Sequence, residues 1–155
     1  MILGIGNDIV EIARIEKAIQ NESFKKRVYT LAEIELIEKK GAGKTASYAG
    51  RFSAKEAISK AMGTGVRGFN LIDIEILNDD MGKPLVVFKN DLKDKMNSHS
   101  LTTILISTML RRNSGYFYIT HLQSGQRKHG NSGKSGLFQY SGIFFILTID
   151  LDFFI

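Results

Sequence analysis

The segment of residues 51–65 constrains this chain most, because its spacing predicts a helix with two different sides. Residues four apart lie on one face of a helix, so Phe52, Glu56 and Lys60 share a face. The opposite side carries small or aliphatic residues: Ala54, Ala57, Ile58 and Ala61. The segment therefore predicts a helix that packs closely on one side and presents a carboxylate and an ammonium group on the other.

Gly63 and Gly65 end this helix in a flexible turn that is rich in backbone amides. A carboxylate, ammonium groups and free amides together suit the binding of a metal-bound phosphate. The alternative is an ordinary exposed face on which Lys55, Glu56 and Lys60 are solvated charges, since Glu–Lys pairs four residues apart are common on helices.

The composition limits the class of protein and the kind of partner. A chain of 155 residues is long enough for one domain with a real core. It contains no cysteine, which excludes disulfides, thiol chemistry and cysteine-ligated zinc and fits a cytoplasmic protein. The sequence has no signal-peptide pattern and no apolar run of about 20 residues, so we expect no membrane span. The net charge of +5 favours an anionic partner, either nucleic acid, a polyphosphate substrate or an acidic protein.

Hydrophobic periodicity and turn residues predict the remaining elements. Strands are expected at residues 2–7, 71–77, 84–88 and 101–106, with a turn at 79–82 between the second and third. Helices are expected at residues 10–19, 31–40, 45–62 and 91–97. The helix from residue 31 begins with a capping box formed by Thr30 and Glu33.

Asp8 follows the first predicted strand and is the first candidate ligand. Taken alone, it also fits the N-cap of the next helix, because Asp8 and Glu11 have capping-box spacing. The three histidines, His99, His121 and His129, form no metal-binding pattern and are expected to be polar surface residues.

Two segments together resemble the signatures of holo-acyl-carrier-protein synthases, a family of 4′-phosphopantetheinyl transferases. They are Gly4-Ile-Gly-Asn-Asp-Ile-Val-Glu-Ile12 and Gly50-Arg-Phe-Ser-Ala-Lys-Glu-Ala-Ile-Ser-Lys-Ala-Met-Gly-Thr-Gly65. Two more agree in order and spacing, Lys26-Arg-Val-Tyr-Thr-Leu-Ala-Glu33 and Asp73-Ile-Glu-Ile-Leu-Asn-Asp-Asp-Met-Gly-Lys-Pro84. The resemblance covers residues 1 to about 107 and implies an α+β fold, with an antiparallel sheet packed against a long helix, that assembles as a homotrimer.

The resemblance also implies a reaction, the Mg²⁺-dependent transfer of 4′-phosphopantetheine from coenzyme A to a serine of an apo acyl carrier protein for fatty acid biosynthesis. Asp8 and Glu56 would be the Mg²⁺ ligands. Glu56, directly or through a metal-bound water, is the candidate base, and Lys60 would neutralise charge on the phosphoryl group. Coenzyme A would be bound by Arg51, Lys55, Lys60, Gly63, Thr64 and Gly65.

Family members bind their acidic carrier protein mainly through the first helix, so the resemblance assigns Arg14 to that contact. Lys17, Lys25, Lys26 and Arg27 supply nearby positive charge, although a solvated basic face would look the same. A nucleic-acid-binding module is an alternative, but it would need aromatic residues among the basic ones, and residues 1–107 lack that arrangement. An inactive remnant of the family is a further alternative.

Residues 108–155 depart from the family. The family's Ser-Ile-Ser-His-like motif and final strand are missing, and Ser107 is followed by Thr-Met-Leu-Arg-Arg. The segment contains no acidic residue before Asp150, and residues 121–142 are rich in Gly and Ser. We hypothesise a frameshift in the coding sequence near Ser107, which divides the chain into a transferase domain of residues 1–107 and an atypical segment of residues 108–155. It would leave the strand at 101–106 with an unpaired edge. A genuine divergent tail is the alternative.

Overall fold

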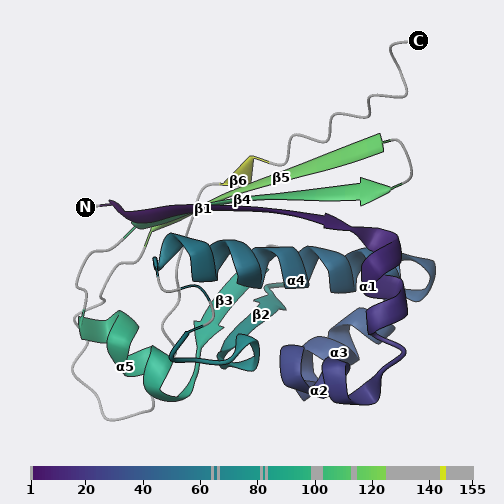
Figure 1. Ribbon diagram of the computed structural model, residues 1–155, viewed down its shortest axis with the longest axis horizontal. Helices are drawn as coiled ribbons and strands as arrows, with labels where there is room; N and C mark the ends of the chain where they lie inside the picture. Colours follow the sequence, from purple (N-terminus) through teal and green to yellow (C-terminus); the bar gives the residue numbers. More distant parts are fainter. Residues whose placement is uncertain are drawn as a thin grey trace.

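The computed structural model describes residues 2–63, 65, 67–80, 82, 84–98, 103–112, 115–124 and 144–145 (Figure 1). Its elements in chain order are β1 Ile2–Glu11, α1 Ile12–Ala18, α2 Glu22–Val28, α3 Leu31–Glu38, α4 Lys44–Ala61, β2 Ile74–Asn78, β3 Pro84–Phe88, α5 Asn90–Ser98, β4 Thr103–Arg112, β5 Gly115–Ser124 and β6 Phe144–Phe145. Single 3₁₀ turns precede α4 and β2, at Gly41–Gly43 and Leu71–Asp73. Among these residues, every helix is too short or too polar to cross a membrane.

The long helix α4 lies between two sheets (Figure 1). One sheet has the strand order β1-β4-β5-β6, and the other is the β2–β3 hairpin. The predicted α+β class is confirmed. The larger sheet is mixed, and not wholly antiparallel as expected, because β1 and β4 run parallel while β5 is antiparallel to β4.

The packing of α4 follows the predicted pattern. Ala54, Ala57, Ile58 and Ala61 are buried in one core cluster with apolar residues of both sheets, among them Ile74, Ile76, Val86, Phe88 and Ile106. A second cluster gathers α1, α2 and α3 around the first half of α4. In it, the rings of Tyr29 and Tyr48 meet edge to face at 4.9 Å, and the Tyr29 hydroxyl donates to the Tyr48 carbonyl.

Strand β1 is longer than predicted. It continues through Glu11, and α1 begins only at Ile12. Parallel pairing with β4, which reaches from Ile2↔Thr103 to Glu11↔Arg111, supplies β1 with backbone partners along this length. Asp8 therefore lies inside a strand, and the N-cap alternative is wrong because Glu11 occupies that position without a side-chain cap.

Shorter local signals are confirmed. Thr30 and Glu33 form the capping box at the start of α3, with the Thr30 hydroxyl accepting from the Glu33 N–H and the Glu33 carboxylate accepting from the Thr30 N–H. The turn of the β2–β3 hairpin closes with the Gly82 N–H donating to the Asp79 carbonyl. The expected strand at 71–77 begins later, because its first three residues form a 3₁₀ turn.

The fourth predicted strand also extends further than expected. β4 continues past Ser107 to Arg112, so the predicted boundary at 107/108 falls inside a strand. Thr108 and Leu110, beyond that boundary, are buried. The expectation of an unpaired edge at 101–106 is wrong for residues 103–106, because β1 and β5 flank β4. Thr64 and residues 125–143 and 146–155 lie outside the described residues.

Candidate active site

The candidate site forms where β1 packs against α4 with very little space between the backbones. A Cβ atom on Gly6 would lie 1.8 Å from the Ala57 carbonyl oxygen, and one on Gly4 would lie 1.8 Å from that of Ala61. Two residues after Gly6 on β1, the carbonyl oxygen of Asp8 accepts a hydrogen bond from the Ser53 hydroxyl at 3.3 Å. The small residues of both signatures thus serve to bring the two elements into contact.

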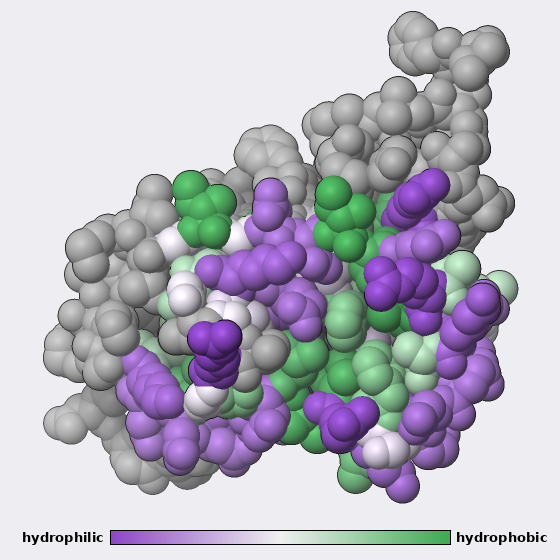
Figure 2. Space-filling view, in the orientation of Figure 1, coloured by the Kyte–Doolittle hydropathy of each residue, from purple (hydrophilic) through white to green (hydrophobic). Residues whose placement is uncertain are grey.

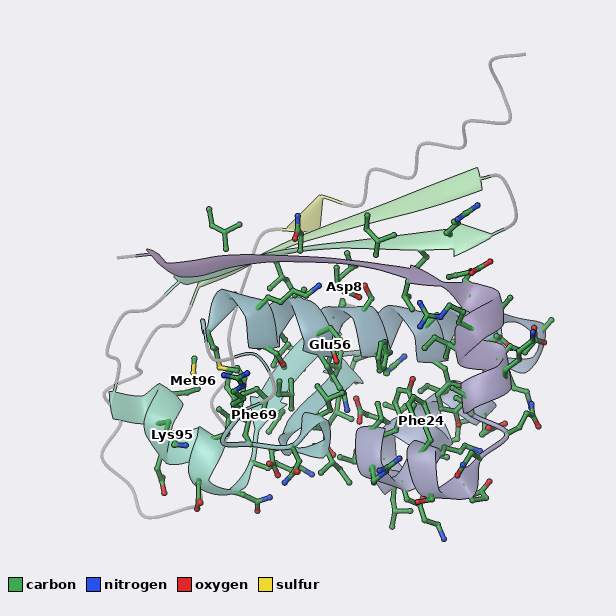
Figure 3. The ribbon with its side chains drawn as sticks, in the orientation of Figure 1. Asp8, Phe24, Glu56, Phe69, Lys95 and Met96 are labelled. Carbon is green, nitrogen blue, oxygen red and sulfur yellow. The ribbon has the colours of Figure 1, made fainter. Side chains whose placement is uncertain are left out.

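The register of this contact has a simple geometric basis. Two residues of a strand span about 6.6 Å, and four residues of a helix rise about 6.0 Å. Strand positions two apart therefore meet helix positions four apart, which pairs Asp8 with Ser53 and Gly6 with Ala57. The face of β1 that meets α4 includes Asp8, so its side chain extends toward the helix that carries Glu56 (Figure 3).

Asp8 and Lys60 form an ion pair across this contact. Lys60 Nζ lies 2.7 Å from Asp8 Oδ1, a normal length for a charge-assisted hydrogen bond. The Asp8 side chain is 12% exposed and the Lys60 side chain 48% exposed. The carboxylate is therefore held within the packed interface, whereas the lysine side chain reaches it from the solvent side.

Glu56 is partly buried beside this pair. Burial raises the pKa of Glu56, the Asp8 charge raises it further, and the Lys60 ammonium group partly offsets both effects. The influence of Asp8 on the Glu56 pKa indicates that two signatures far apart in the sequence bring their carboxylates into one electrostatic environment. Among the described residues no group of three or more His, Cys, Asp or Glu side chains is placed to hold a metal ion. The site therefore offers two carboxylates, to which a phosphate-bearing ligand could add oxygens.

Arg51 and Lys55 are buried, whereas a phosphate site at the surface would require exposed side chains. Lys55 is fully buried, and its Nζ donates to Glu33 Oε2 at 2.7 Å and to the Val28 carbonyl. Arg51 is buried too, with Nε donating to the Ile76 carbonyl at 3.0 Å and a terminal nitrogen donating to Asn78 Oδ1 at 2.7 Å. Both cations point from α4 into the protein, because they lie on the side that faces α3 and the hairpin. Neither is a solvated charge, and their predicted contact with coenzyme A finds no support in this arrangement.

Two glycines in the turn after α4 adopt positive φ angles. Gly63 and Gly65 have φ values of 73° and 57°, in the left-handed region that favours glycine. The Gly63 N–H also closes the helix end by donating to the Lys60 carbonyl. This turn follows Ala61 almost directly and is therefore close in sequence to the Lys60 end of the site.

The predicted carrier-binding residues divide into exposed and paired cations. Arg14 and Lys17 on α1 and Arg27 on α2 are exposed, as is Lys26. Lys25 is only partly exposed, because its ammonium group lies 3.5 Å from Glu38 Oε1 and over the Tyr48 ring. The first helix thus presents the positive charge that was expected of it, while Lys25 also helps to hold α2 against α4.

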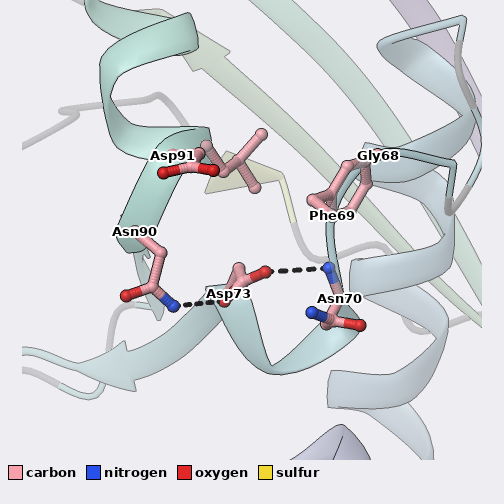
Figure 4. Close-up of a pocket in the computed structure, with 7 residues that line it drawn as sticks. Gly68, Phe69, Asn70, Asp73, Asn90 and Asp91 are labelled. Atoms are coloured by element: carbon pink, nitrogen blue, oxygen red, sulfur yellow. Dashed lines mark hydrogen bonds between the residues drawn. The ribbon is translucent and has the colours of Figure 1, made fainter.

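An open pocket of about 480 Å³ lies between the turn before β2 and the start of α5 (Figure 4). Its lining residues are Gly68, Phe69, Asn70, Asp73, Asn90, Asp91 and Leu92. The Asp73 carboxylate accepts from the Asn70 N–H at 2.8 Å and from the Asn90 side chain, so it fixes these two segments. None of the site residues predicted from the sequence lines this pocket.

Sequence reasoning missed contacts of two residues that fix α4, the helix that carries Glu56 and Lys60. The Ser53 hydroxyl donates to the backbone carbonyl of Asp8. On the far side of α4, the Glu33 carboxylate accepts a hydrogen bond from the Lys55 ammonium group. Position 53 could have been found from its spacing, since it lies four residues before Ala57 on the side that packs against β1. Glu33 was recognised only as a capping residue, because nothing local shows that its second carboxylate oxygen accepts from the Ile76 N–H.

The comparisons with known proteins agree with this geometry. Residues 4–109 match the model of the 4′-phosphopantetheinyl transferase superfamily. A holo-[acyl-carrier-protein] synthase of Fusobacterium nucleatum is 65% identical over 92 residues, which cover 59% of this chain and 75% of that protein. The chain therefore belongs to the 4′-phosphopantetheinyl transferase superfamily, within its holo-[acyl-carrier-protein] synthase family of enzymes.

Solved structures support the same family. The crystal structure of the Neisseria meningitidis holo-[acyl-carrier-protein] synthase superposes with a TM-score of 0.62 at 32% identity, over 72% of this chain and 90% of that one. The Helicobacter pylori enzyme, solved in complex with coenzyme A, superposes with a TM-score of 0.54 at 33% identity, over 73% of this chain and 91% of that one. The α+β fold is thus the fold of this enzyme family.

Proposed function

We propose that this protein transfers the 4′-phosphopantetheine group of coenzyme A to a serine of an apo acyl carrier protein, in a Mg²⁺-dependent reaction in the cytoplasm. The products are the holo carrier protein, used in fatty acid biosynthesis, and adenosine 3′,5′-bisphosphate. The observation that carries this proposal is the meeting of Asp8, Glu56 and Lys60 at the contact of β1 with α4. The names of the relatives and the coenzyme A complex of the Helicobacter pylori enzyme support it.

The donor set fits a Mg²⁺ ion. This ion prefers oxygen ligands, uses one or two carboxylates, and completes its shell with water and substrate phosphate. Asp8 and Glu56 would hold it, and the negative charge of Asp8, which helps to raise the Glu56 pKa, places the two carboxylates within electrostatic reach of each other. When bound, the ion would supply positive charge to the pyrophosphate of coenzyme A.

The chain's own residues would then act on the two reactants. The carrier serine oxygen forms a bond to the β-phosphorus of coenzyme A, while the bond from that phosphorus to the bridging pyrophosphate oxygen breaks. Glu56 would take the serine proton, directly or through a water, and the water route is preferred because a carboxylate bound to a metal ion is a poor base. The Lys60 ammonium group lies within reach to neutralise charge on the phosphoryl or the leaving group.

The direct test is a transfer assay with the full chain, Mg²⁺, coenzyme A and an apo acyl carrier protein, followed by mass spectrometry of the carrier. Transfer should attach phosphopantetheine to the carrier, and Glu56→Gln should lower the rate by roughly 10²–10⁴-fold, the usual effect of removing a general base. Glu35→Gln, at an exposed position of α3, is the matched control and should transfer normally. A carrier of unchanged mass, or a Glu56→Gln enzyme as fast as the unmodified one, contradicts the proposal.

For the carrier, we propose a docking surface around Arg14 and Lys17 of α1, extended by Lys25 and Arg27 of α2. Exposed charges at the rim of an interface chiefly set the encounter rate and its salt dependence. Arg14→Glu should therefore weaken the use of the carrier and leave coenzyme A binding unchanged. Lys39→Glu, a charge reversal at the exposed end of α3, is the control. An equal loss of both affinities in Arg14→Glu would show that this division of roles is wrong.

A homotrimer is also part of the proposal. Ile5 and Ile9 are 72% and 62% exposed on the face of β1 that points away from α4. Figure 2 shows hydrophobic areas over β1 among hydrophilic side chains. In the proposed trimer, another protomer covers this face. An Ile5→Ser/Ile9→Ser double variant should therefore have a lower molecular mass of the assembly, measured by light scattering, than the unmodified protein.

A further inference from the structure

The contact between Lys60 and Asp8 joins a fixed group to a movable one. The backbone of Asp8 is held by the parallel pairing of β1 with β4 and by the hydroxyl of Ser53. Lys60 reaches Asp8 Oδ1 from the last turn of α4 through a flexible four-carbon chain, with 48% of its side chain exposed. The short, largely buried Asp8 side chain on a fixed backbone has little freedom to move, whereas the long and half-exposed Lys60 side chain can swing away.

A divalent cation at Asp8 would bind the same carboxylate as Lys60. Mg²⁺ binds carboxylate oxygens at about 2.0–2.1 Å and demands near-octahedral geometry. The Lys60 Nζ lies 2.7 Å from Asp8 Oδ1, so the ammonium group occupies one of the two carboxylate oxygens that a bound cation would use. Two positive charges so close together repel each other, and the Lys60 charge also acts on the other proposed ligand, Glu56.

We infer that the Lys60 ammonium group and a divalent cation compete for the Asp8 carboxylate. Cation binding then releases Lys60 from Asp8, and the freed ammonium group becomes available to the phosphates of the donor. This inference rests on the magnesium site of the proposed function and deepens it. According to this inference, Lys60 stays paired with Asp8 and contacts phosphate only after the cation has bound.

Manganese binding in the absence of coenzyme A tests the competition, with the signal of free Mn²⁺ followed by electron paramagnetic resonance. Lys60→Gln should bind Mn²⁺ roughly two- to fivefold more tightly than the unmodified protein, a small factor because partly exposed ion pairs are weak. Lys60→Met is a second variant that also lacks the ammonium group. Lys44→Gln is the matched control, since it removes one charge and one exposed ion pair, with Glu38, from the other end of α4.

An Asp8→Asn background separates competition from general repulsion. If the two cations compete through Asp8, Lys60→Gln should no longer tighten Mn²⁺ binding once Asp8 is Asn. Persistence of the gain in that background, an equal gain in Lys44→Gln, or no gain in either Lys60 variant would each overturn the inference. Mn²⁺ binding that depends on Asp8 but not on Lys60 overturns this inference alone. Binding that does not depend on Asp8 overturns the metal site of the proposed function as well.

Discussion

At the scale of single residues, neighbours in the sequence have opposite environments. Lys55 is fully buried in an ion pair with Glu33, whereas Glu56 lies partly exposed beside Asp8. Consecutive residues of a helix point about 100° apart, so the first faces α3 and the second faces β1. The charged residues of one motif therefore divide into buried cations that pair within the fold and partly exposed groups that lie beside Asp8.

The raised pKa of Glu56 predicts a pH-dependent stability. The folded protein holds the Glu56 proton more tightly than the unfolded chain does, so ionising Glu56 lowers the free energy of unfolding as the pH rises through the folded pKa. Glu56→Gln removes this cost. Its free energy of unfolding should exceed that of the unmodified protein at about pH 7, and the gap should narrow as the pH falls toward about 4.

Urea denaturation at several pH values, with a chelator present, measures this difference. Glu35→Gln is the control, since that side chain is exposed on α3 and should leave the pH dependence unchanged. A Glu56→Gln variant that is less stable than the unmodified protein at neutral pH would show that the ionised carboxylate stabilises the fold, contrary to the destabilisation expected from its raised pKa.

Burial gives Lys55 a structural role with a large expected effect. Lys55→Met would leave the Glu33 carboxylate buried without its cation, which typically costs about 3–5 kcal/mol. Lys44→Met breaks only the exposed ion pair with Glu38 and should cost at most about 1 kcal/mol. Chemical denaturation of both variants gives the comparison. A nearly neutral Lys55→Met would instead favour a surface role such as the predicted phosphate contact.

At the scale of elements, the site depends on how closely β1 approaches α4. Glycines on the strand and alanines on the helix let the two backbones touch, and Asp8 reaches the helix only because they do. The other sides of α4 are tied to the hairpin by Arg51 and to α3 by Lys55. The helix that carries Glu56 and Lys60 is thus fixed from three directions.

Gly6→Ala tests this contact. The added Cβ would lie 1.8 Å from the Ala57 carbonyl oxygen, so strand and helix must separate. Overpacking of this kind costs about 1–3 kcal/mol, and here it should also weaken Mn²⁺ binding through Asp8. Gly43→Ala is the control, because a Cβ there meets nothing within 4 Å and φ is −83°. Equal stability of the two variants, measured by urea denaturation, would show that the close approach has no energetic importance.

At the scale of the whole molecule, the larger sheet joins the beginning of the chain to its later part. Ile2 pairs with Thr103 and Glu11 with Arg111, so β1 is held in place by a strand about a hundred residues away. The half of β4 after Ser107 pairs with the half of β1 that contains Asp8. The integrity of the site thus depends on residues beyond the end of the predicted transferase domain.

A chain that ends after Ser107 should therefore fold poorly. It loses the parallel partners of Asp8, Ile9, Val10 and Glu11, together with the buried side chains of Thr108 and Leu110. A chain that ends after Ser124 keeps β4 and β5 and should be more soluble and more stable than the shorter one. Solubility and urea denaturation of the two truncations and the full chain provide the test, and equal behaviour of the two truncations would contradict it. Whether a frameshift lies near Ser107 stays a prediction, which the nucleotide sequence decides.

The sequence by itself determined the features whose causes lie within a few residues. The periodicity of α4, the capping box at Thr30 and Glu33 and the turn of the β2–β3 hairpin were all predicted correctly, because helix faces, caps and turns are local. The joint presence of two signatures also linked Asp8 to Glu56, and the folded chain brings these two carboxylates into one electrostatic environment.

Only the tertiary structure decided how long β1 is and where the cations of α4 go. Strand β1 extends through Glu11 because β4 pairs with it, and no local pattern reveals a partner about a hundred residues away. Lys55 and Arg51 read as surface charges in the sequence, yet they are buried because Glu33, Ile76 and Asn78 supply acceptors from other elements. A buried charge is tolerated only where such partners converge, and that convergence is a property of the folded chain.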